Sequence, residues 1–395
     1  MAWGKKKAPI DPNLIPTEGT KVGNLKAESP TERYMSRFKE SEPLEPPFYL
    51  TTTNPMLDCA LDEKGRGIPC GSHICYFGEP GHGKSVTGLL PASTVQGLGG
   101  FVMVQDPEHR HKPSLYELLS INTDESMGQF KLHHPLSLEE AFRNIIEFGE
   151  DILSFAPSPN EPPYYFFCDG IAGLQTQRVA VKRKKKNKGN LQESQEPMGM
   201  AGLFNEFMRH EVIRKLSKRN AYFVWTNQVR DLVDFMSRKR VKHFPGGWAL
   251  KHQLSAIIEV YKSTIKDDLT KAQSDQIHDD FPPGVRINYK CLKAPGPEGR
   301  RAWMPWFFNW GADMALGMWN WIYEHSDTNH MFIKHKGQGV YIMWGQEGTK
   351  EQWLEWVYAS QDNMNNFTKY FKECYQYVSS YKGNKTFGVQ QDEEM

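Results

Sequence analysis

Short apolar runs along the chain alternate with longer segments in which apolar residues recur every three or four positions. The runs show no clean alternation of apolar and polar residues, as expected of strands with helices over both faces. They are HICYF, GFVMVQD, YYFFCDG, AYFVWTNQ, SAIIEVYK and VRINYKCLK, at residues 73–77, 100–106, 164–170, 221–228, 255–262 and 285–293. Helices are expected at residues 85–97, 114–120 and 138–155 and before residue 216. The alternation predicts an α/β fold with a mostly parallel twisted sheet and helices on both faces.

The chain divides into four segments by composition. Residues 1–45 have few apolar side chains and cannot fold alone, so we expect an oligomerisation arm that orders on a neighbouring molecule. Residues 46–300 hold the alternating strands and helices of the core. Residues 301–385 are rich in tryptophan and predict a small α/β C-terminal domain, whose tryptophans form its core or, less readily, a duplex-binding surface. Residues 386–395 are a short acidic tail.

Composition and charge narrow the class of protein. Of the 395 residues, 24% are charged and 39% are hydrophobic, and no apolar run approaches the roughly 20 residues that span a bilayer. The basic N-terminus has no hydrophobic segment behind it, so we expect no secretion signal, no membrane partner and a cytoplasmic location. The six cysteines lack metal-ligand spacing, so we expect no structural metal. The net charge of +1 implies that any nucleic-acid binding comes from local basic patches.

A glycine-rich stretch, GEPGHGKS, lies between the first of these strands and an expected helix. In a phosphate-binding loop, the glycines let backbone N–H groups surround the phosphates. The lysine reaches the β and γ oxygens, and the serine hydroxyl binds Mg²⁺. The alternative is a glycine-rich turn with an incidental lysine. The candidate nucleotide-binding residues are Gly78, Glu79, Pro80, Gly81, His82, Gly83, Lys84, Ser85 and Val86.

Acidic residues end two further strands. Asp106 and Glu108 follow one strand and Asp169 follows another. In a parallel sheet, ligands bind at the carboxyl ends of the strands, so these acids are expected beside the loop. Asp169 suits a carboxylate that orders the waters of Mg²⁺, and Glu108 suits the group that positions or deprotonates the attacking water. Either acid could instead cap the helix that follows it.

Six stretches of the chain, taken in order, carry a family resemblance. They are TTTNPMLDCALDEKGRGIPCGSHICYFGEPGHGKS, FVMVQDPEH, YYFFCDGIAGL, MGMAGLFNEFMRHEVIRKLSKRNAYFVWTNQVR, GGWALK and RINYKCLKAP. Their order and spacing resemble the RecA family of recombinases, and in particular its bacteriophage UvsX-type members. The resemblance covers roughly residues 48–295 and implies a RecA-like P-loop ATPase core with ATP and Mg²⁺ as cofactors. It makes Tyr116 a candidate for stacking on adenine, a position that Leu115 fits as well.

Lys84 of the glycine-rich loop is one candidate catalytic residue. The resemblance implies catalytic roles for further residues. Glu108 matches the catalytic glutamate of the family, and Gln228 matches the glutamine that senses the γ-phosphate. A buried glutamine bonded to backbone would look the same in the sequence. Lys290 and Lys293 match paired lysines that reach the ATP of the neighbouring subunit and stabilise charge there. Their spacing leaves open which of the two does so.

The resemblance places DNA at two loops. One follows the strand that ends near Asp169, and the other follows the strand that ends near Gln228. The first loop, at about 178–198, would contact phosphates without reading sequence, and its basic run is also typical of a solvated loop. The second, at about 230–247, mixes cations with apolar residues, which suits a sequence-tolerant single-strand binder or equally a protein partner. The candidate DNA-binding residues are Lys182, Arg183, Lys184, Lys185, Lys186, Lys188 and Met198 in the first loop, and Arg230, Val233, Phe235, Met236, Arg238, Lys239, Arg240, Lys242, Gly246 and Gly247 in the second.

The resemblance implies an ATP-dependent strand-exchange recombinase, a DNA-dependent ATPase of homologous recombination and repair. Its subunits would form a helical filament on single-stranded DNA and pair it with homologous duplex DNA. A single-strand-binding protein and a loader are the expected further partners, and the cytoplasm of a phage-infected bacterial cell is the expected setting. The alternatives are a ring-forming helicase of the same fold and a recombination mediator that binds ATP only as a structural ligand.

Overall fold

The computed structural model describes residues 45–174, 176, 196–233, 240–243, 247–265, 284–296, 299–326, 332–337 and 339–382. Apart from Glu45, these residues belong to the unit Pro46–Met395. The expected acidic tail and all of the expected N-terminal arm except Glu45 lie outside them, so both stay predictions. No helix in these ranges is both long and apolar enough to cross a membrane.

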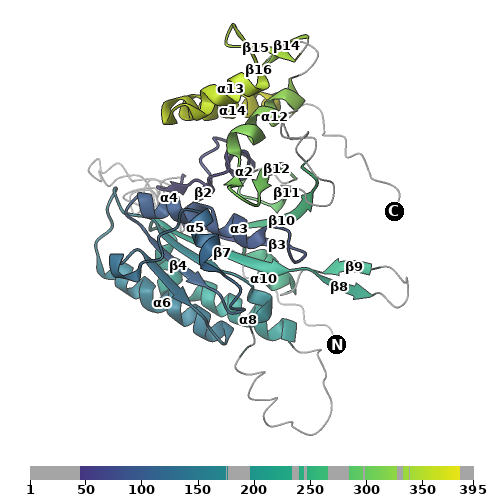
Figure 1. Ribbon diagram of the computed structural model, residues 1–395. Coiled ribbons are helices and arrows are strands. Elements are labelled where there is room, and N and C mark those ends of the chain that lie inside the picture. Colours follow the sequence, from purple (N-terminus) through teal and green to yellow (C-terminus); the bar gives the residue numbers. More distant parts are fainter. Residues whose placement is uncertain are drawn as a thin grey trace, which may run out of the picture. The chain divides into compact units, whose positions relative to one another are not determined.

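A nine-stranded sheet forms the centre of the fold (Figure 1). Its order is β13-β12-β11-β10-β3-β7-β6-β4-β5, and the six strands from β10 to β5 run parallel. The strands β11, β12 and β13 continue it in antiparallel order. The strands are β3 His73–Gly78, β4 Phe101–Gln105, β5 Phe130–His133, β6 Tyr164–Cys168, β7 Ala221–Gln228, β10 Ala256–Ser263, β11 Gly284–Lys293, β12 Arg301–Phe307 and β13 Gly311–Ala312. The α/β class with a mainly parallel sheet is therefore confirmed.

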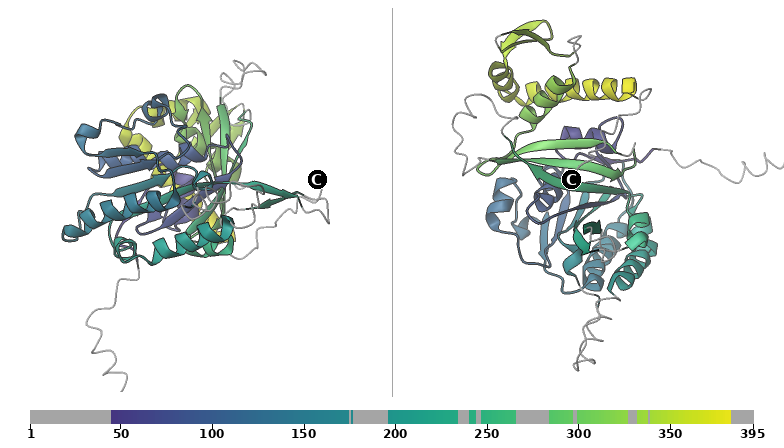
Figure 2. Two further views of the ribbon diagram at one scale, coloured as in Figure 1. Left: turned by 90° about the horizontal axis from the view of Figure 1, so that it is seen from below. Right: turned by 90° about the vertical axis from the view of Figure 1, so that its right-hand side faces the viewer.

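Helices cover both faces of this sheet (Figure 2). Neighbouring residues of β3 show why the apolar runs do not alternate: Ile74 and Tyr76 belong to one hydrophobic cluster, while Cys75 and Phe77 belong to the other. The first cluster includes residues of α2 Pro55–Leu61, α3 Lys84–Leu89, α4 Pro91–Gly97 and α5 Pro113–Leu118. The second includes residues of α6 Leu138–Ser154, α8 Glu196–Arg209, α9 Glu211–Leu216 and α10 Gly247–Gln253.

Helix α6 illustrates how the local sequence sets these elements. Ser137 caps its start by accepting a hydrogen bond from the backbone N–H of Glu140 at 3.2 Å. Its buried residues recur at the spacing of one helix face: Leu138, Ala141, Phe142, Ile145, Gly149 and Ile152. A Cβ on Gly149 would lie 2.7 Å from Cδ1 of Leu216, so this glycine lets α6 approach α9 closely.

The residues after 300 contribute strands to the central sheet and then form a helical layer. Strands β14 Lys334–Gly337, β15 Val340–Met343 and β16 Gln346–Thr349 make a small antiparallel sheet beside α12 Met314–His325, α13 Lys350–Tyr358 and α14 Gln361–Lys382. Five tryptophans of this segment are at most 6% exposed: Trp303, Trp306, Trp319, Trp321 and Trp353. Most of the tryptophans are thus core residues. Strand β12, which follows the expected domain boundary near residue 300, lies within the nine-stranded sheet. The boundary itself stays a prediction.

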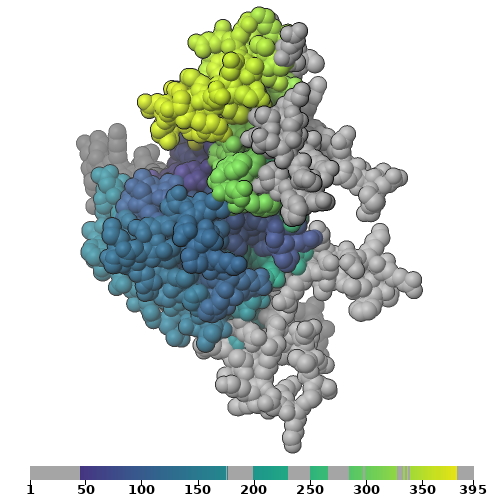
Figure 3. All heavy atoms as spheres, viewed as in Figure 1, coloured from purple at the N-terminus to yellow at the C-terminus, as the bar shows by residue number. Residues whose placement is uncertain are grey.

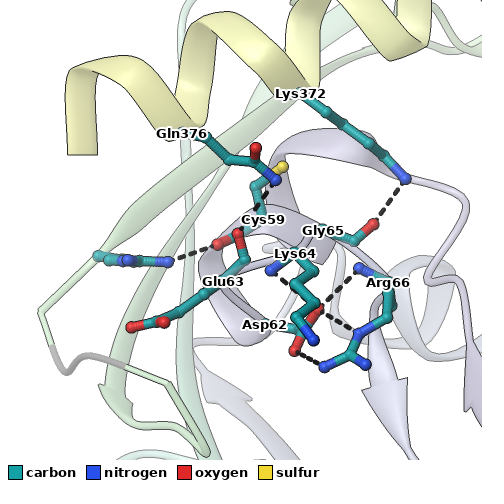
Figure 4. A network of polar contacts seen from close by, with 9 residues as sticks. Cys59, Asp62, Glu63, Lys64, Gly65, Arg66, Lys372 and Gln376 are labelled. Atoms are coloured by element: carbon teal, nitrogen blue, oxygen red, sulfur yellow. Dashed lines mark hydrogen bonds and ion pairs between the residues drawn. The ribbon is translucent and has the colours of Figure 1, made fainter. Parts of the chain in front are cut away.

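Helix α14 is tied to the turn that follows α2 (Figure 4). Lys372 donates through Nζ to the carbonyl of Gly65 at 2.6 Å, and Gln376 donates to the carbonyl of Glu63 at 3.4 Å. The turn is itself closed by Arg66, whose guanidinium bonds both carboxylate oxygens of Asp62 at 2.9 and 3.0 Å. In the space-filling view, purple atoms at the start of the described chain lie between the yellow helices and the blue core (Figure 3).

Two short strands, β1 Tyr49–Leu50 and β2 Ile68–Pro69, pair on either side of α2 in the sequence. The helix begins at Asn54, whose side chain accepts from the backbone N–H groups of the first turn. It also buries Asp58, which takes hydrogen bonds from Thr51 at 2.5 Å and from Thr52 at 2.6 and 2.7 Å. Burial raises the pKa of Asp58.

Candidate active site

The candidate phosphate-binding loop joins β3 to α3 in the middle of the sheet. Gly78 ends β3, residues 79–83 form the loop, and Lys84, Ser85 and Val86 begin α3. Gly81 and Gly83 have φ angles of 73° and 89°, a left-handed backbone that residues with a Cβ rarely adopt. A Cβ on Gly83 would lie 2.5 Å from Cδ1 of Ile287, whereas one on Gly81 would meet nothing within 4 Å. Both conformation and packing therefore require glycine at position 83.

Lys84 is the buried cation of this loop. The residue is only 8% exposed, and its Nζ donates to the carbonyls of Gly78 at 3.1 Å and Glu79 at 2.8 Å. Burial lowers the pKa of Lys84, while the nearby carboxylates of Asp169 and Glu108 act in the opposite direction. The ammonium group is thus near both acids and is held by oxygen atoms of the loop.

Asp169 follows β6, where its backbone N–H donates to the carbonyl of Gln105 at 2.9 Å. Its Oδ1 accepts from the hydroxyl of Thr226 at 2.5 Å, and its Oδ2 lies 2.7 Å from Nε2 of His111. Burial by itself raises the pKa of Asp169. The hydrogen bond from His111, together with the hydroxyls of Ser85 and Thr226, outweighs burial and holds this pKa below its usual value. Asp169 is therefore an anion that links the loop to two neighbouring strands.

Glu108 lies in the same group of residues, after β4. Its Oε1 accepts from Nε2 of Gln228 at 3.2 Å, and its Oε2 pairs with Arg110 at 2.8 Å. The side chain also lies against the turn after Asp169, because a Cβ on Gly173 would be 2.9 Å from Oε1 and one on Gly170 would be 3.3 Å from the carboxyl carbon. The glycines of this turn therefore make room for the carboxylate.

Among the nucleotide-binding candidates, Tyr116 takes an unexpected position. It is 4% exposed, packs edge-on against Phe130 with ring centroids 5.5 Å apart, and lies with its hydroxyl 2.9 Å from Nδ1 of His111. This placement suits Tyr116 to holding His111 in position better than to stacking on a base. Leu115, the other candidate, is partly buried on α5.

The sequence reasoning missed two residues of this group, His111 and Thr226. His111 stands in the stretch DPEHRHKP, only three residues after Glu108, and Thr226 stands two residues before Gln228. Their positions beside recognised residues were the available signal. A single histidine or threonine is too common there to identify a contact with Asp169.

The paired lysines of β11 differ in their surroundings. Lys293 donates through Nζ to three carbonyls at the end of α10, those of Lys251 at 3.1 Å, His252 at 3.1 Å and Leu254 at 2.5 Å. It therefore stabilises the end of the helix that begins at Gly247. Lys290 is half-buried and pairs in the sheet with Glu259 and Arg301 through its backbone register.

The DNA-binding candidates are only partly described. Strands β8 Arg230–Val233 and β9 Arg240–His243 form an antiparallel ribbon that opposes Arg230 to His243 and Val233 to Arg240, with Lys242 opposite Asp231. Gly247 is the first residue of α10, and Met198 lies in α8. The remaining candidates lie outside the described residues: Lys182, Arg183, Lys184, Lys185, Lys186, Lys188, Phe235, Met236, Arg238, Lys239 and Gly246.

The residues of the loop fit a nucleotide with Mg²⁺. Ser85 and Asp169 supply the hard oxygen ligands that Mg²⁺ prefers, and Mg²⁺ usually keeps waters and takes the rest of its ligands from substrate phosphates. The described part of the chain holds no group of three or more histidine, cysteine, aspartate or glutamate side chains that could hold a metal ion. Gly81 leaves space beside the loop, and Lys84 supplies a cation at its centre.

This fold and this loop define the class: a P-loop α/β protein with a RecA-like core. No protein-family model matches the chain. The chain is similar to Protein RecA of Rhodopirellula baltica, with 28% identity over 219 residues, which cover 55% of this chain and 52% of that protein. The chain thus spans about half the length of the curated relative it matches. The similarity supports membership of the RecA family.

Proposed function

We propose that this protein is an ATP-dependent recombinase, which forms helical filaments on single-stranded DNA and pairs it with homologous duplex DNA. The similarity to Protein RecA supports a role in recombination and repair at the level of the family. The more particular resemblance to phage UvsX-type proteins, seen in the motif set, supports action in the cytoplasm of a phage-infected bacterial cell.

The observation that carries this proposal is the hydrogen bond between Gln228 and Glu108, at 3.2 Å. It joins the candidate catalytic group to the last residue of β7, and β8, the start of the candidate second DNA loop, begins only two residues later at Arg230. A movement of that loop can therefore reach the carboxylate through one side chain. If DNA is to change the rate of hydrolysis, the DNA-binding loop must be connected to the catalytic carboxylate in this way.

Each residue of the site has its own role in the proposed hydrolysis of ATP. The loop glycines and Lys84 hold the phosphates, while Ser85 and Asp169 hold Mg²⁺ and its waters. Held by Ser85 and Asp169, Mg²⁺ would offset the negative charge of the phosphates. Glu108 accepts a proton from the attacking water as general base. Each oxygen of Glu108 already has one partner, Gln228 on one side and Arg110 on the other, and each keeps a further lone pair for the water.

Assembly completes the proposed site. Lys290 and Lys293 would stabilise charge on the ATP of a neighbouring subunit, and the N-terminal arm would pack on the adjacent core. Of the two lysines, Lys290 suits the action in trans better, because Lys293 already bonds three carbonyls of its own chain. An arm-on-neighbour contact is heterologous and extends into a filament where the rotation does not close.

DNA would be held by the two basic loops and not by the charge of the whole molecule, which is only +1. Phosphate contacts from the first loop and a mixture of cations and apolar residues in the second suit sequence-independent binding. A single-strand-binding protein and a loader are the further partners we propose.

The test measures ATP hydrolysis with and without single-stranded DNA, on the full chain and on Glu108→Gln, with negative-stain images of the same samples. Loss of the general base should lower the DNA-stimulated rate by about 10²-fold or more. Glu117→Gln is the matched control, because this exposed glutamate of α5 should leave the rate unchanged.

Each result selects one of the functions. Stimulation by DNA, its loss in Glu108→Gln and extended filaments support the recombinase. Closed rings favour a helicase of the same fold. A rate that ignores both DNA and the substitution favours a mediator that binds ATP as a structural ligand, and it overturns the proposal.

A further inference from the structure

His111 is a buried side chain that the proposed chemistry does not yet use. Its side chain is 2% exposed, and both ring nitrogens and the backbone N–H have hydrogen-bond partners. Nε2 lies 2.7 Å from Oδ2 of Asp169, Nδ1 lies 2.9 Å from the hydroxyl of Tyr116, and the backbone N–H donates to Oδ2 of Asp106 at 2.9 Å. The imidazole ring is also nearly parallel to the ring of Phe167, at 14°.

The proton positions follow from the chemistry of the partners. An ionised Asp169 only accepts hydrogen bonds, so Nε2 of His111 must carry the proton that it donates. In the neutral ring, Nδ1 then accepts from the hydroxyl of Tyr116. Tyr116 thereby fixes both the orientation of the imidazole and the nitrogen that holds its proton, as partners of metal-ligating groups commonly do.

Asp169 is restrained through both of its oxygens as a result. Thr226 donates to Oδ1 at 2.5 Å from β7, and His111 donates to Oδ2 from the segment after β4. These donors fix the plane of the carboxylate and leave further lone pairs of each oxygen for water. Without the imidazole, Oδ2 would lose this donor, and only the hydroxyls of Thr226 and Ser85 would hold the carboxylate against the attraction of Lys84.

We propose that His111, held by Tyr116, is a positioning residue that orients Asp169 for the waters of Mg²⁺. The inference rests on the proposed function and deepens it, since it assigns the order of contacts Tyr116, His111, Asp169 to the metal side of the site. It also replaces base stacking as the task of Tyr116. The rival explanation is that the three side chains only satisfy one another inside the core.

The first experiment measures binding of ADP to the full chain, with excess EDTA and across a Mg²⁺ titration. His111→Leu should leave the affinity in EDTA unchanged and raise the half-saturating Mg²⁺ concentration about tenfold or more, as is typical when a partner of a metal ligand is lost. Tyr116→Phe keeps the ring and should give a smaller rise. His111→Gln, whose amide can still donate to Asp169, should restore most of the affinity for Mg²⁺.

Tyr222→Phe is the matched control, because it removes another buried hydroxyl, bonded to Asn220 at 2.7 Å, at the opposite end of β7 from the site. Nitrogen-15 NMR of the labelled histidines, with the His111 signal assigned by its loss in His111→Leu, reads the proton position without nucleotide or metal. The proposal expects a protonated Nε2 and an unprotonated Nδ1 in the neutral ring.

The outcomes separate this inference from the function on which it rests. A wild-type chain that needs Mg²⁺ for tight binding, beside a folded His111→Leu with the same Mg²⁺ requirement, overturns the inference alone. An equal shift in Tyr222→Phe, or a proton on Nδ1, also overturns it. A wild-type chain that binds no nucleotide overturns the proposed function and the inference together.

Discussion

Removing one charge of the buried ion pair between Glu161 and Arg219 should destabilise the fold strongly and leave nucleotide binding unchanged. The pair lies at the amino ends of β6 and β7, at the edge of the sheet opposite the candidate site. The side chains are 3% and 5% exposed, and Nε of Arg219 donates to Oε1 of Glu161 at 2.6 Å. The other oxygen of Glu161 accepts from the backbone N–H of Asn220 at 3.0 Å. The carboxylate therefore joins two loops at once.

Glu161→Gln keeps the volume of the side chain but leaves the guanidinium buried without its counter-charge. Breaking a buried pair in this way costs about 3 to 5 kcal/mol. Unfolding entropy of about 2 cal/mol/K per residue, over the roughly 350 residues of the unit Pro46–Met395, converts this into a fall in Tm of about 4 to 7 °C. The exposed pair of Glu125 and Lys131 provides the matched control, since its side chains are 48% and 45% exposed. Glu125→Gln should lower the Tm far less, because solvent screens an exposed pair.

The assay is thermal unfolding of both variants, followed by ADP binding in the presence of Mg²⁺. We expect a clear fall in Tm for Glu161→Gln alone and equal ADP affinity for all three proteins below that temperature. A Tm for Glu161→Gln no lower than that of Glu125→Gln would refute the reasoning about burial. A loss of ADP affinity in Glu161→Gln would refute the separation of the two edges of the sheet.

Two further predictions concern the active site and the core. Gly173→Ala places a methyl group 2.9 Å from Oε1 of Glu108, so DNA-stimulated hydrolysis should fall roughly tenfold with ADP affinity unchanged, because small displacements of a reacting group are costly. Gly202→Ala, whose Cβ meets nothing within 4 Å, is its control, and equal rates in the two variants would contradict the placement of Glu108. Burial lowers the pKa of His73 to about 3, so below pH 6.5 the unfolded chain takes up a proton that the folded chain does not. Stability should therefore fall on acidification toward pH 3, by at most about 1.4 kcal/mol per pH unit. His73→Phe should lose this slope in unfolding measured between pH 7 and 5, and equal slopes would count against the buried neutral histidine.

Much of the fold could be predicted because its signals are local. The six apolar runs correspond to β3, β4, β6, β7, β10 and β11, since a strand buried on both faces must be apolar along its whole length. Strand β5 was missed, because Phe130–His133 reads FKLH, which is too short and too polar to stand out. Strand β12 was missed as well, because its tryptophans belong to the tryptophan-rich composition that predicts a separate C-terminal domain.

The candidate site was predictable in part for the same reason. The glycines of the loop reflect a backbone requirement that acts at single positions, and the acids stand at strand ends that the apolar runs define. Lys293 shows the limit of this approach. The family resemblance pairs it with Lys290. Its three hydrogen bonds, however, go to carbonyls at the end of α10, which are 39 to 42 residues away in the sequence.

The sequence by itself determined six strands of the central sheet, several of the helices and the glycine loop, since burial periodicity and backbone strain depend on residues that are close in the chain. Only the tertiary structure decided which side chains meet. His111 reaches Asp169 across 58 residues, and Gln228 reaches Glu108 across 120. These contacts exist because the sheet orders its strands as β3, β7, β6 and β4, and strand order is set by packing of the whole sheet. No local pattern carries that information.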